Sequence, residues 1–136
     1  MADRPLSPHL SVYRMHRYTV LTSITNRFTG VVLSAGLIVL VYWLMAAAGG
    51  AKAYARALGV LSSGLFQAIF LLLLAAFSYH LFAGIRHLIW DSGRGLERRQ
   101  SQRSAWLLGI ASLLLFAGLA WWACLHWAIA GAGGPQ

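Results

Sequence analysis

The residue with the most informative chemistry is a histidine inside a long apolar run. His80 lies within the run that ends near Trp90, and His87 lies close to its end. An ionisable side chain at membrane depth is costly, so it is a functional candidate by default. Imidazole is also a common axial ligand of haem iron. We therefore treat His80 as a candidate haem ligand, with a hydrogen-bonded packing residue as the alternative.

Small residues flank His80 along one helical face. Ala76 precedes it by four residues, and Ala83 and Gly84 follow it by three and four, so all would share a face. They would clear a flat space for a macrocycle or for a neighbouring helix. His87 falls on the same stripe about 10 Å further along, where haem carboxylates would reach toward water. A helix-packing seam of small residues is the alternative.

A low-spin haem b needs two axial ligands, and this requirement bears on partners. His126 is the other histidine inside an apolar run, beside Trp121, Trp122 and Trp127. It falls about 30 Å along its run, at the membrane surface opposite to His80, and its neighbours are typical of an interfacial aromatic belt. One iron cannot bridge these positions. We therefore expect the second ligand of a His80-bound haem to come from another polypeptide.

A second constellation lies at the start of the first apolar run. Ser23 and Arg27 are four residues apart and would share a face of a helix. A hydroxyl and a guanidinium near the lipid boundary could hydrogen-bond a quinone carbonyl, and Arg27 could instead pair with a haem propionate. The alternative is a helix cap at Thr22 or Ser23, with Arg27 as a basic membrane anchor.

The composition places these residues in a membrane protein. The 136 residues are 59% hydrophobic and 10% charged, whereas a soluble domain carries about 25% charged residues. Three apolar runs, at about residues 28–48, 62–90 and 105–130, reach the roughly 20 residues that a spanning helix needs. Glycines at 49–50 and 93 would end the first two. We expect an all-α protein of three transmembrane helices, with an N-terminal segment 1–27 and a flexible tail 131–136.

The net charge of +8 is unevenly placed along the chain. The arginines that flank the first span or join the second to the third are Arg4, Arg14, Arg17, Arg27, Arg94, Arg98, Arg99 and Arg103. Only Lys52 and Arg56 lie between the first two spans. The positive-inside rule then predicts a cytoplasmic N-terminus and an external C-terminus, so the charge does not call for nucleic acid. Residues 1–27 lack the apolar core of a signal peptide. We expect a bacterial inner membrane, with the mitochondrial inner membrane as the alternative.

Three motifs stand out: residues 4–10 with Tyr13, residues 23–30, and residues 80–91 continuing to 93–96. These motifs resemble those of the cytochrome b anchor subunits of succinate dehydrogenase, the respiratory complex II. Together with the three spans, the likeness covers nearly the whole chain. One position departs from the family pattern, because Asn26 stands where the family usually has a histidine before the arginine. Asparagine can donate a hydrogen bond but carries no charge, so a protonation or propionate-pairing role at this position is in question.

The resemblance implies a role for each candidate residue. His80 would be one axial ligand of haem b, a second anchor subunit would supply the other, and His87 would lie near a haem propionate. Ser23 and Arg27 would line a quinone site beside an iron–sulfur subunit, which receives electrons from a flavoprotein subunit that oxidises succinate. With one cysteine, Cys124, and no flavin motif, the chain is not expected to catalyse alone.

Two other classes of function remain open from the residues. A haem-free structural anchor of a respiratory complex would use His80 only for packing. A small transporter or channel component would need polar or interrupted helices at mid-membrane, and the spans contain few hydroxyls and no proline.

Overall fold

The computed structural model describes residues 17–132, with side chains described for residues 18–129. This part of the chain forms four helices and contains no strand: α1 (Arg17–Ala48), α2 (Ala51–Leu61), α3 (Gly64–Asp91) and α4 (Arg98–Ala132). Three of them, α1, α3 and α4, are long and apolar enough to cross a membrane. The predicted all-α class with three spans is confirmed. The motif at residues 4–13 lies outside the described residues.

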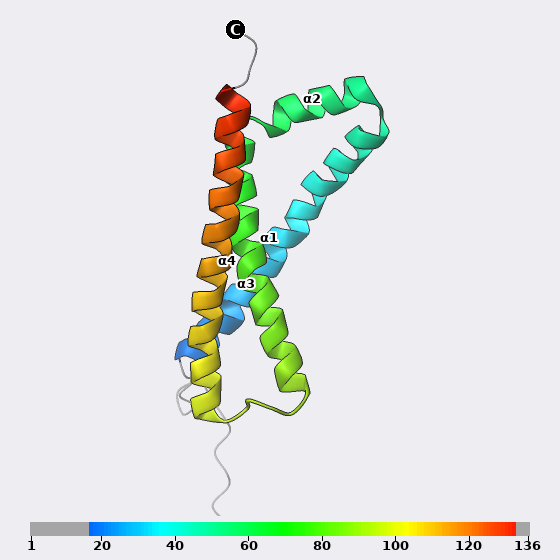
Figure 1. Cartoon of the computed structure of the whole chain (residues 1–136). Helices are drawn as coiled ribbons and strands as arrows, with labels where there is room; N and C mark the ends of the chain where they lie inside the picture. Colours follow the sequence, from blue (N-terminus) through cyan, green and yellow to red (C-terminus); the bar gives the residue numbers. More distant parts are fainter. Residues whose placement is uncertain (1–16, 133–136) are drawn as a thin grey trace, which may run out of the picture.

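The helices form an antiparallel pair crossed by a third helix (Figure 1). α3 and α4 run side by side in opposite directions. α1 starts beside the first turns of α4, crosses α3 and leans away toward the far end, where α2 bridges back to the start of α3 (Figure 1). We refer to the end that holds the α3–α4 connection as the loop end and to the other as the α2 end.

Small residues of α3 and α4 are deeply buried. Ser78, Ala83 and Ala123 are 0%, 2% and 4% exposed, and the hydroxyl of Ser78 donates to the carbonyl of Leu74 at 2.8 Å. In lipid, the hydrophobic effect does not drive helices together, because the lipid tails are as apolar as the side chains. Helices associate there through close packing, which small side chains with satisfied hydrogen bonds permit. Large apolar side chains point outward instead, so that Trp121 is 74% exposed. The outer surface therefore suits lipid or further membrane helices.

The helix ends follow the glycines. α1 ends just before Gly49 and Gly50, and Gly50 adopts a positive φ of 86°. α3 ends at Asp91, and Gly93 has a φ of 76°. Both φ values lie in the left-handed region that glycine adopts without a Cβ penalty. Both helices thus end next to the glycines singled out in the sequence.

The helices are longer than the apolar runs. α1 begins at Arg17, so residues 17–27 of the expected N-terminal segment are helical. α4 begins at Arg98, so three arginines assigned to a loop lie on its first turns instead. Helix α2 was not predicted, because its 11 residues are too few to span a membrane and carry two charges. Its buried Ala57, 1% exposed, fixes it across the α2 end.

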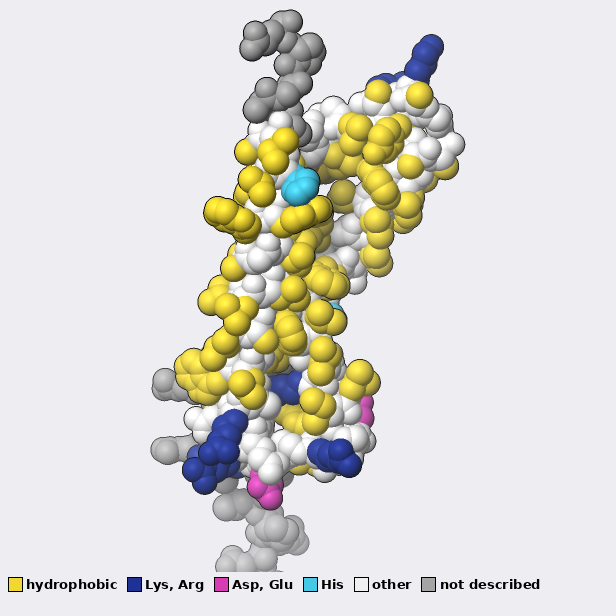
Figure 2. Space-filling model, in the orientation of Figure 1, with side chains coloured by type: hydrophobic (Ala, Val, Ile, Leu, Met, Phe, Trp, Pro, Cys, Tyr) yellow, Lys and Arg dark blue, Asp and Glu magenta, His cyan; other side chains and the backbone are white. Residues whose placement is uncertain are grey.

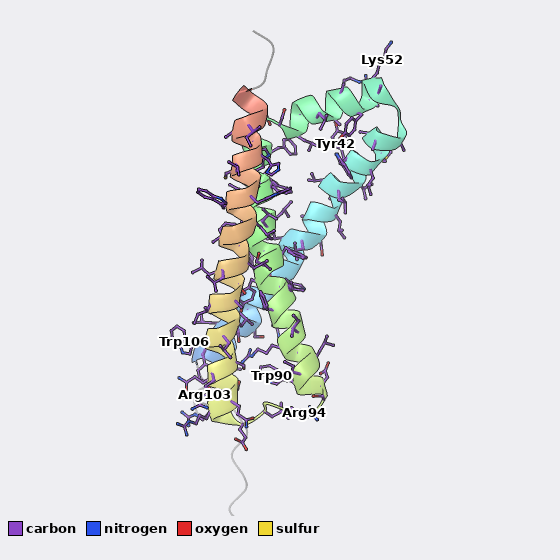
Figure 3. All side chains as sticks on the ribbon, in the orientation of Figure 1. Tyr42, Lys52, Trp90, Arg94, Arg103 and Trp106 are labelled. Carbon is purple, nitrogen blue, oxygen red and sulfur yellow. The ribbon has the colours of Figure 1, made fainter. Side chains whose placement is uncertain are left out.

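Basic side chains gather at the loop end (Figure 2). Arg94 and Arg103 lie at that end, and Lys52 lies at the α2 end (Figure 3). The uneven charge expected from the sequence therefore maps onto the two ends of the described structure. Which side of a membrane each end faces stays a prediction from the positive-inside rule.

Candidate functional site

His80 lies on the face of α3 that meets α1. Its Nδ1 is 3.1 Å from the hydroxyl oxygen of Thr29. The α1 backbone comes so close at Gly30 that a Cβ there would lie 3.2 Å from Cε1 of the ring. The Nε2 atom makes no hydrogen bond within the described residues. α1 thus holds one side of the half-buried imidazole and leaves one ring nitrogen available to a ligand.

His80 also lines an apolar groove between α1 and α3 with a volume of about 570 Å³. Its walls include Leu37, Leu74 and Phe77. This volume lies within the range of about 300–1,000 Å³ that small-molecule sites occupy. An apolar groove with a single imidazole suits a bulky apolar group that needs one protein ligand.

The available ligands distinguish a haem from a bare metal ion. Among residues 17–132, no group of three or more His, Cys, Asp or Glu side chains could hold a metal ion. Haem iron takes its in-plane ligands from the porphyrin and needs the protein only for axial positions. His80, with Nε2 free of partners among the described residues, therefore fits the axial position of a haem.

The stripe of small residues around His80 divides in two. Ala76 and Ala83 are 5% and 2% exposed, because they are packed inside the chain. The flat space expected beside them is therefore absent in this part of the structure. Gly84 differs, since a Cβ built there would meet no atom within 4 Å. Space for a flat group remains at Gly84, one turn from His80.

His87 is exposed and lies about 10 Å from His80 toward the loop end, at 1.5 Å per helical residue. Its Nδ1 lies 2.7 Å from the carbonyl oxygen of Ala83 and must donate to it. The ring also stands edge-on to Trp90, with centroids 5.5 Å apart. Its Nε2 has no hydrogen bond among the described residues. The side chain is therefore available to a group that arrives from outside the chain.

His126 lies at a different depth from His80. Its Nδ1 lies 2.9 Å from the carbonyl oxygen of Trp122. The neighbouring Trp127 meets Phe70 with ring centroids 5.8 Å apart. Phe70 is ten residues before His80 in α3, which corresponds to about 15 Å along the helix. The two histidines are therefore too far apart to share one iron.

Ser23 and Arg27 lie well inside α1. Because the helix begins at Arg17, neither Thr22 nor Ser23 caps it, and the capping alternative is wrong. Thr22 faces α3, where it accepts a hydrogen bond from Arg86 at 3.3 Å. At about 100° per residue, Ser23 and Arg27 lie roughly 100–140° around the helix from Thr22. They therefore share a face that is turned away from α3.

Both side chains lack internal partners. Ser23 is half-buried, Arg27 is exposed, and neither makes a hydrogen bond or ion pair with another described residue. Ser23 lies about 9 Å toward the loop end from Thr29, the contact of His80. The face thus presents a hydroxyl and a guanidinium that no described residue of the chain satisfies.

Asn26 lies on α1 between Ser23 and Thr29. Its side-chain oxygen Oδ1 is buried and has no hydrogen-bond partner among the described residues. A buried acceptor without a donor costs about 1–3 kcal/mol. A bound group or partner subunit that brings a donor to this position would remove that cost.

Arg86 is a feature that the sequence analysis missed. It is 5% exposed, and its guanidinium donates to Ser104 Oγ at 2.9 Å, to the Ser101 carbonyl at 3.0 Å and to Thr22 Oγ1 at 3.3 Å. It also stacks 3.9 Å above the Trp90 ring centroid. Arg86 therefore joins α1, α3 and α4 at the loop end. An arginine inside an apolar run is the signal that could have identified it, by the same argument that identified His80.

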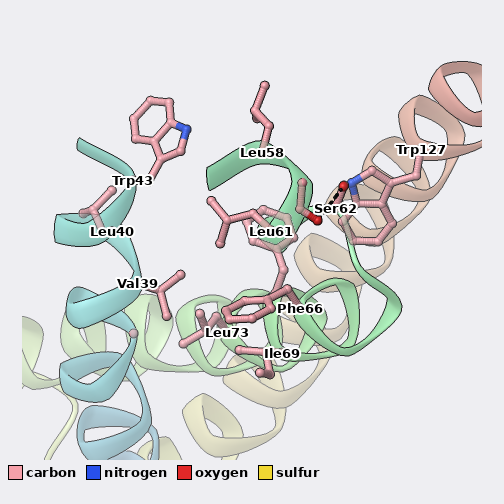
Figure 4. A pocket seen from close by; sticks show the side chains of 13 residues that line it. Val39, Leu40, Trp43, Leu58, Leu61, Ser62, Phe66, Ile69, Leu73 and Trp127 are labelled. Atoms are coloured by element: carbon pink, nitrogen blue, oxygen red, sulfur yellow. Dashed lines mark hydrogen bonds between the residues drawn. The ribbon is translucent and has the colours of Figure 1, made fainter. Parts of the chain in front are cut away.

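A second cleft, of about 710 Å³, opens at the α2 end where α1 leans away (Figure 4). Apolar side chains from α1, α2 and α3 surround it, among them Trp43, Leu61 and Phe66 (Figure 4). No titratable side chain lines it. His80 and the other candidate site residues therefore lie outside this cleft.

Comparisons with known proteins agree on one family. Residues 2–119 match the model of the succinate dehydrogenase/fumarate reductase transmembrane subunit family. The chain is 43% identical over 113 residues to the succinate dehydrogenase cytochrome b556 subunit of Paracoccus denitrificans, covering 83% of this chain and 86% of that one. It is 38% identical over 125 residues to the cytochrome b560 subunit of Reclinomonas americana, with 88% and 85% covered. The human mitochondrial cytochrome b560 subunit is 33% identical over 121 residues, with 88% and 71% covered.

Proposed function

The chain belongs to the succinate dehydrogenase/fumarate reductase transmembrane subunit family, and we propose that it is the cytochrome b membrane anchor of a succinate dehydrogenase. One observation carries the haem part of this proposal. His80, on the membrane-spanning helix α3, lines an apolar groove between α1 and α3. Its Nδ1 contacts Thr29, and its Nε2 has no partner among residues 17–132. When bound, haem b supplies a one-electron carrier inside the membrane.

The chain provides one axial ligand and a second anchor subunit provides the other. His126 is too far from His80 to be the second ligand. Its neighbour Trp127 contacts Phe70, which lies about 15 Å along α3 from His80. His87 lies toward the loop end with a free ring nitrogen, which suits a hydrogen bond to a haem propionate. The exposed apolar faces of the three spans offer the surface against which a second anchor would pack.

The quinone site lies on the face of α1 that carries Ser23 and Arg27. The Ser23 hydroxyl and the Arg27 guanidinium can both donate to a quinone carbonyl oxygen, and donors aimed at an oxygen that gains negative charge stabilise it as it forms. The iron–sulfur subunit completes this site, in keeping with the lack of a hydrogen-bond or ion-pair partner for Ser23 and Arg27 among the described residues. Arg27 is also the residue that could pair with a propionate instead.

The chain acts as a subunit of a larger enzyme. The flavoprotein and iron–sulfur subunits oxidise succinate, and this chain positions quinone and haem near them. The exposed arginines at the loop end, Arg94, Arg98, Arg99 and Arg103, offer a basic surface for those soluble subunits. By the positive-inside rule this end faces the cytoplasm of a bacterium, with the chain in the inner membrane.

Purification of the tagged chain from its own membranes in mild detergent tests the proposal. We expect a flavoprotein, an iron–sulfur protein and a second small membrane protein to copurify, with succinate:quinone reductase activity and a b-type visible spectrum. The same subunits without a pigment would establish the haem-free anchor instead. A chain that purifies without these subunits would overturn the proposal.

A further inference from the structure

The hydroxyl of Thr29 contacts His80 and bears on which ring nitrogen carries the proton. Thr29 is 7% exposed, and its Oγ1 donates to the backbone carbonyl of Asn26 at 3.0 Å. The same oxygen lies 3.1 Å from Nδ1 of His80. A threonine hydroxyl has one hydrogen to donate and lone pairs to accept with. Because the Asn26 carbonyl takes that hydrogen, the second contact is favourable only if Nδ1 carries a proton and donates it to Oγ1.

This arrangement selects one tautomer of the imidazole. With the proton on Nδ1, the lone pair is on Nε2, the nitrogen that has no partner among the described residues. In metal sites, a ligating histidine almost always donates its other N–H to an acceptor, which fixes the tautomer and the ring orientation and makes the ligand more basic. Here Thr29 Oγ1 would be that acceptor for the Nδ1–H of His80, while its own hydrogen is donated to the Asn26 carbonyl.

The backbone of α1 restricts the same ring from a second direction. A Cβ at Gly30 would lie 3.2 Å from Cε1 and 3.8 Å from Nδ1 of His80. The Cε1 edge of the imidazole therefore packs against Gly30, while Nδ1 hydrogen-bonds to Thr29. Rotation of the ring about its side-chain bonds would break the hydrogen bond or bring the ring into α1.

From these contacts we infer that Thr29 is a positioning residue, whose hydroxyl accepts the Nδ1 proton of His80 and thereby presents Nε2 to haem iron. The inference rests on the proposed function, because it assumes that His80 is the ligand. Thr29 touches neither iron nor quinone in this account. It acts through the imidazole, by fixing its tautomer and orientation and by raising its basicity.

Two pairs of proteins separate the hydroxyl from the shape of the side chain. Thr29→Val keeps the volume of the wild-type side chain and removes the oxygen. Thr29→Ala and Thr29→Ser both lack the methyl group and differ from each other only in the oxygen. Ser112→Ala is a matched control, since Ser112 is a 7% exposed hydroxyl residue of α4 that lies outside the groove and donates to the Leu108 carbonyl at 2.6 Å. All are measured in the purified complex.

The midpoint potential of the b haem and the haem content per complex are the readouts. A more basic ligand favours ferric iron, so loss of the acceptor in Thr29→Val and Thr29→Ala is expected to raise the potential. A tenfold change in the ferric–ferrous equilibrium corresponds to 59 mV for one electron, and we expect a shift up to about that size. Loss of such an outer partner also weakens metal binding by about 10–100-fold, so haem content is expected to fall. Thr29→Ser and Ser112→Ala are expected to match wild type.

Two results would overturn the role of Thr29. Equal shifts in Thr29→Ser and Thr29→Ala would assign the effect to the missing methyl group and overturn it, as would wild-type values in Thr29→Val and Thr29→Ala. If Thr29→Val does not assemble, the comparison of serine with alanine still decides. His80→Ala, measured in parallel, separates the two levels of the account: a retained b-type spectrum there refutes the proposed ligand, whereas its loss with unaltered Thr29 variants refutes only the positioning role.

Discussion

Replacement of Arg27 with alanine is expected to slow quinone reduction and to leave succinate oxidation intact. The side chain is exposed and makes no hydrogen bond or ion pair with another described residue. Surface substitutions of this kind change folding stability by about 0.5 kcal/mol or less. The complex should therefore assemble normally, and any loss of activity should report on a group that comes from outside the chain.

The size of the effect follows from the contact that would be lost. A hydrogen bond that involves a charged group contributes about 1.5–3 kcal/mol. Since about 1.4 kcal/mol corresponds to a factor of ten in rate, Arg27→Ala should lower kcat/KM for quinone by roughly 10–150-fold. Arg27→Lys should recover part of this loss, because it keeps the charge without the planar guanidinium.

Two assays on the same preparation give the answer. Succinate oxidation is followed once with a quinone analogue and once with an artificial soluble electron acceptor that bypasses the membrane anchor. Arg56→Ala removes another exposed arginine at the α2 end and is the matched control. Equal losses in both assays, or no loss with quinone, would refute the role of Arg27 at the quinone site.

Three further substitutions test other parts of the account. Ser23→Ala should lower kcat/KM for quinone by about 2–10-fold, the value of one neutral hydrogen bond, and wild-type kinetics would remove Ser23 from the site. Arg86→Lys should lower the Tm of the complex, because the loss of two charge-assisted bonds at about 1.5 kcal/mol each costs about 3 kcal/mol, whereas the exposed Arg94→Lys should not; an unchanged Tm would contradict the joining role of Arg86. His87→Ala should keep the b-type absorption band and shift its midpoint potential, and loss of the band would mean that His87 has a different role.

Features that depend on local sequence could be predicted for this chain. Three apolar runs of membrane length and the glycines at 49–50 and 93 determined the spans and two of their ends, because backbone freedom and hydropathy act over a few residues. The helix α2 escaped prediction because it is too short to span and lies between runs. The extension of α1 to Arg17 escaped it because residues 17–27 are too polar to count as apolar.

The surroundings of His80 could not be read from the sequence. Thr29 and His80 are 51 residues apart in the chain, and their contact depends on where α1 crosses α3. Likewise, Ala76 and Ala83 share a stripe with His80, but only the packing shows that they are buried while Gly84 is open. Periodicity identified which residues share a face, and the tertiary structure determined which part of that face is available to a ligand.

The most direct test of the central claim is a reduced-minus-oxidised visible spectrum of the purified complex from three chains: wild type, His80→Ala and His126→Ala. His126 is an exposed spanning-helix histidine that bonds to the Trp122 carbonyl, so it controls for the removal of an imidazole. The account predicts a b-type band in wild type and in His126→Ala, and its loss in His80→Ala with the subunits still copurifying. A band of equal height in all three proteins would contradict it.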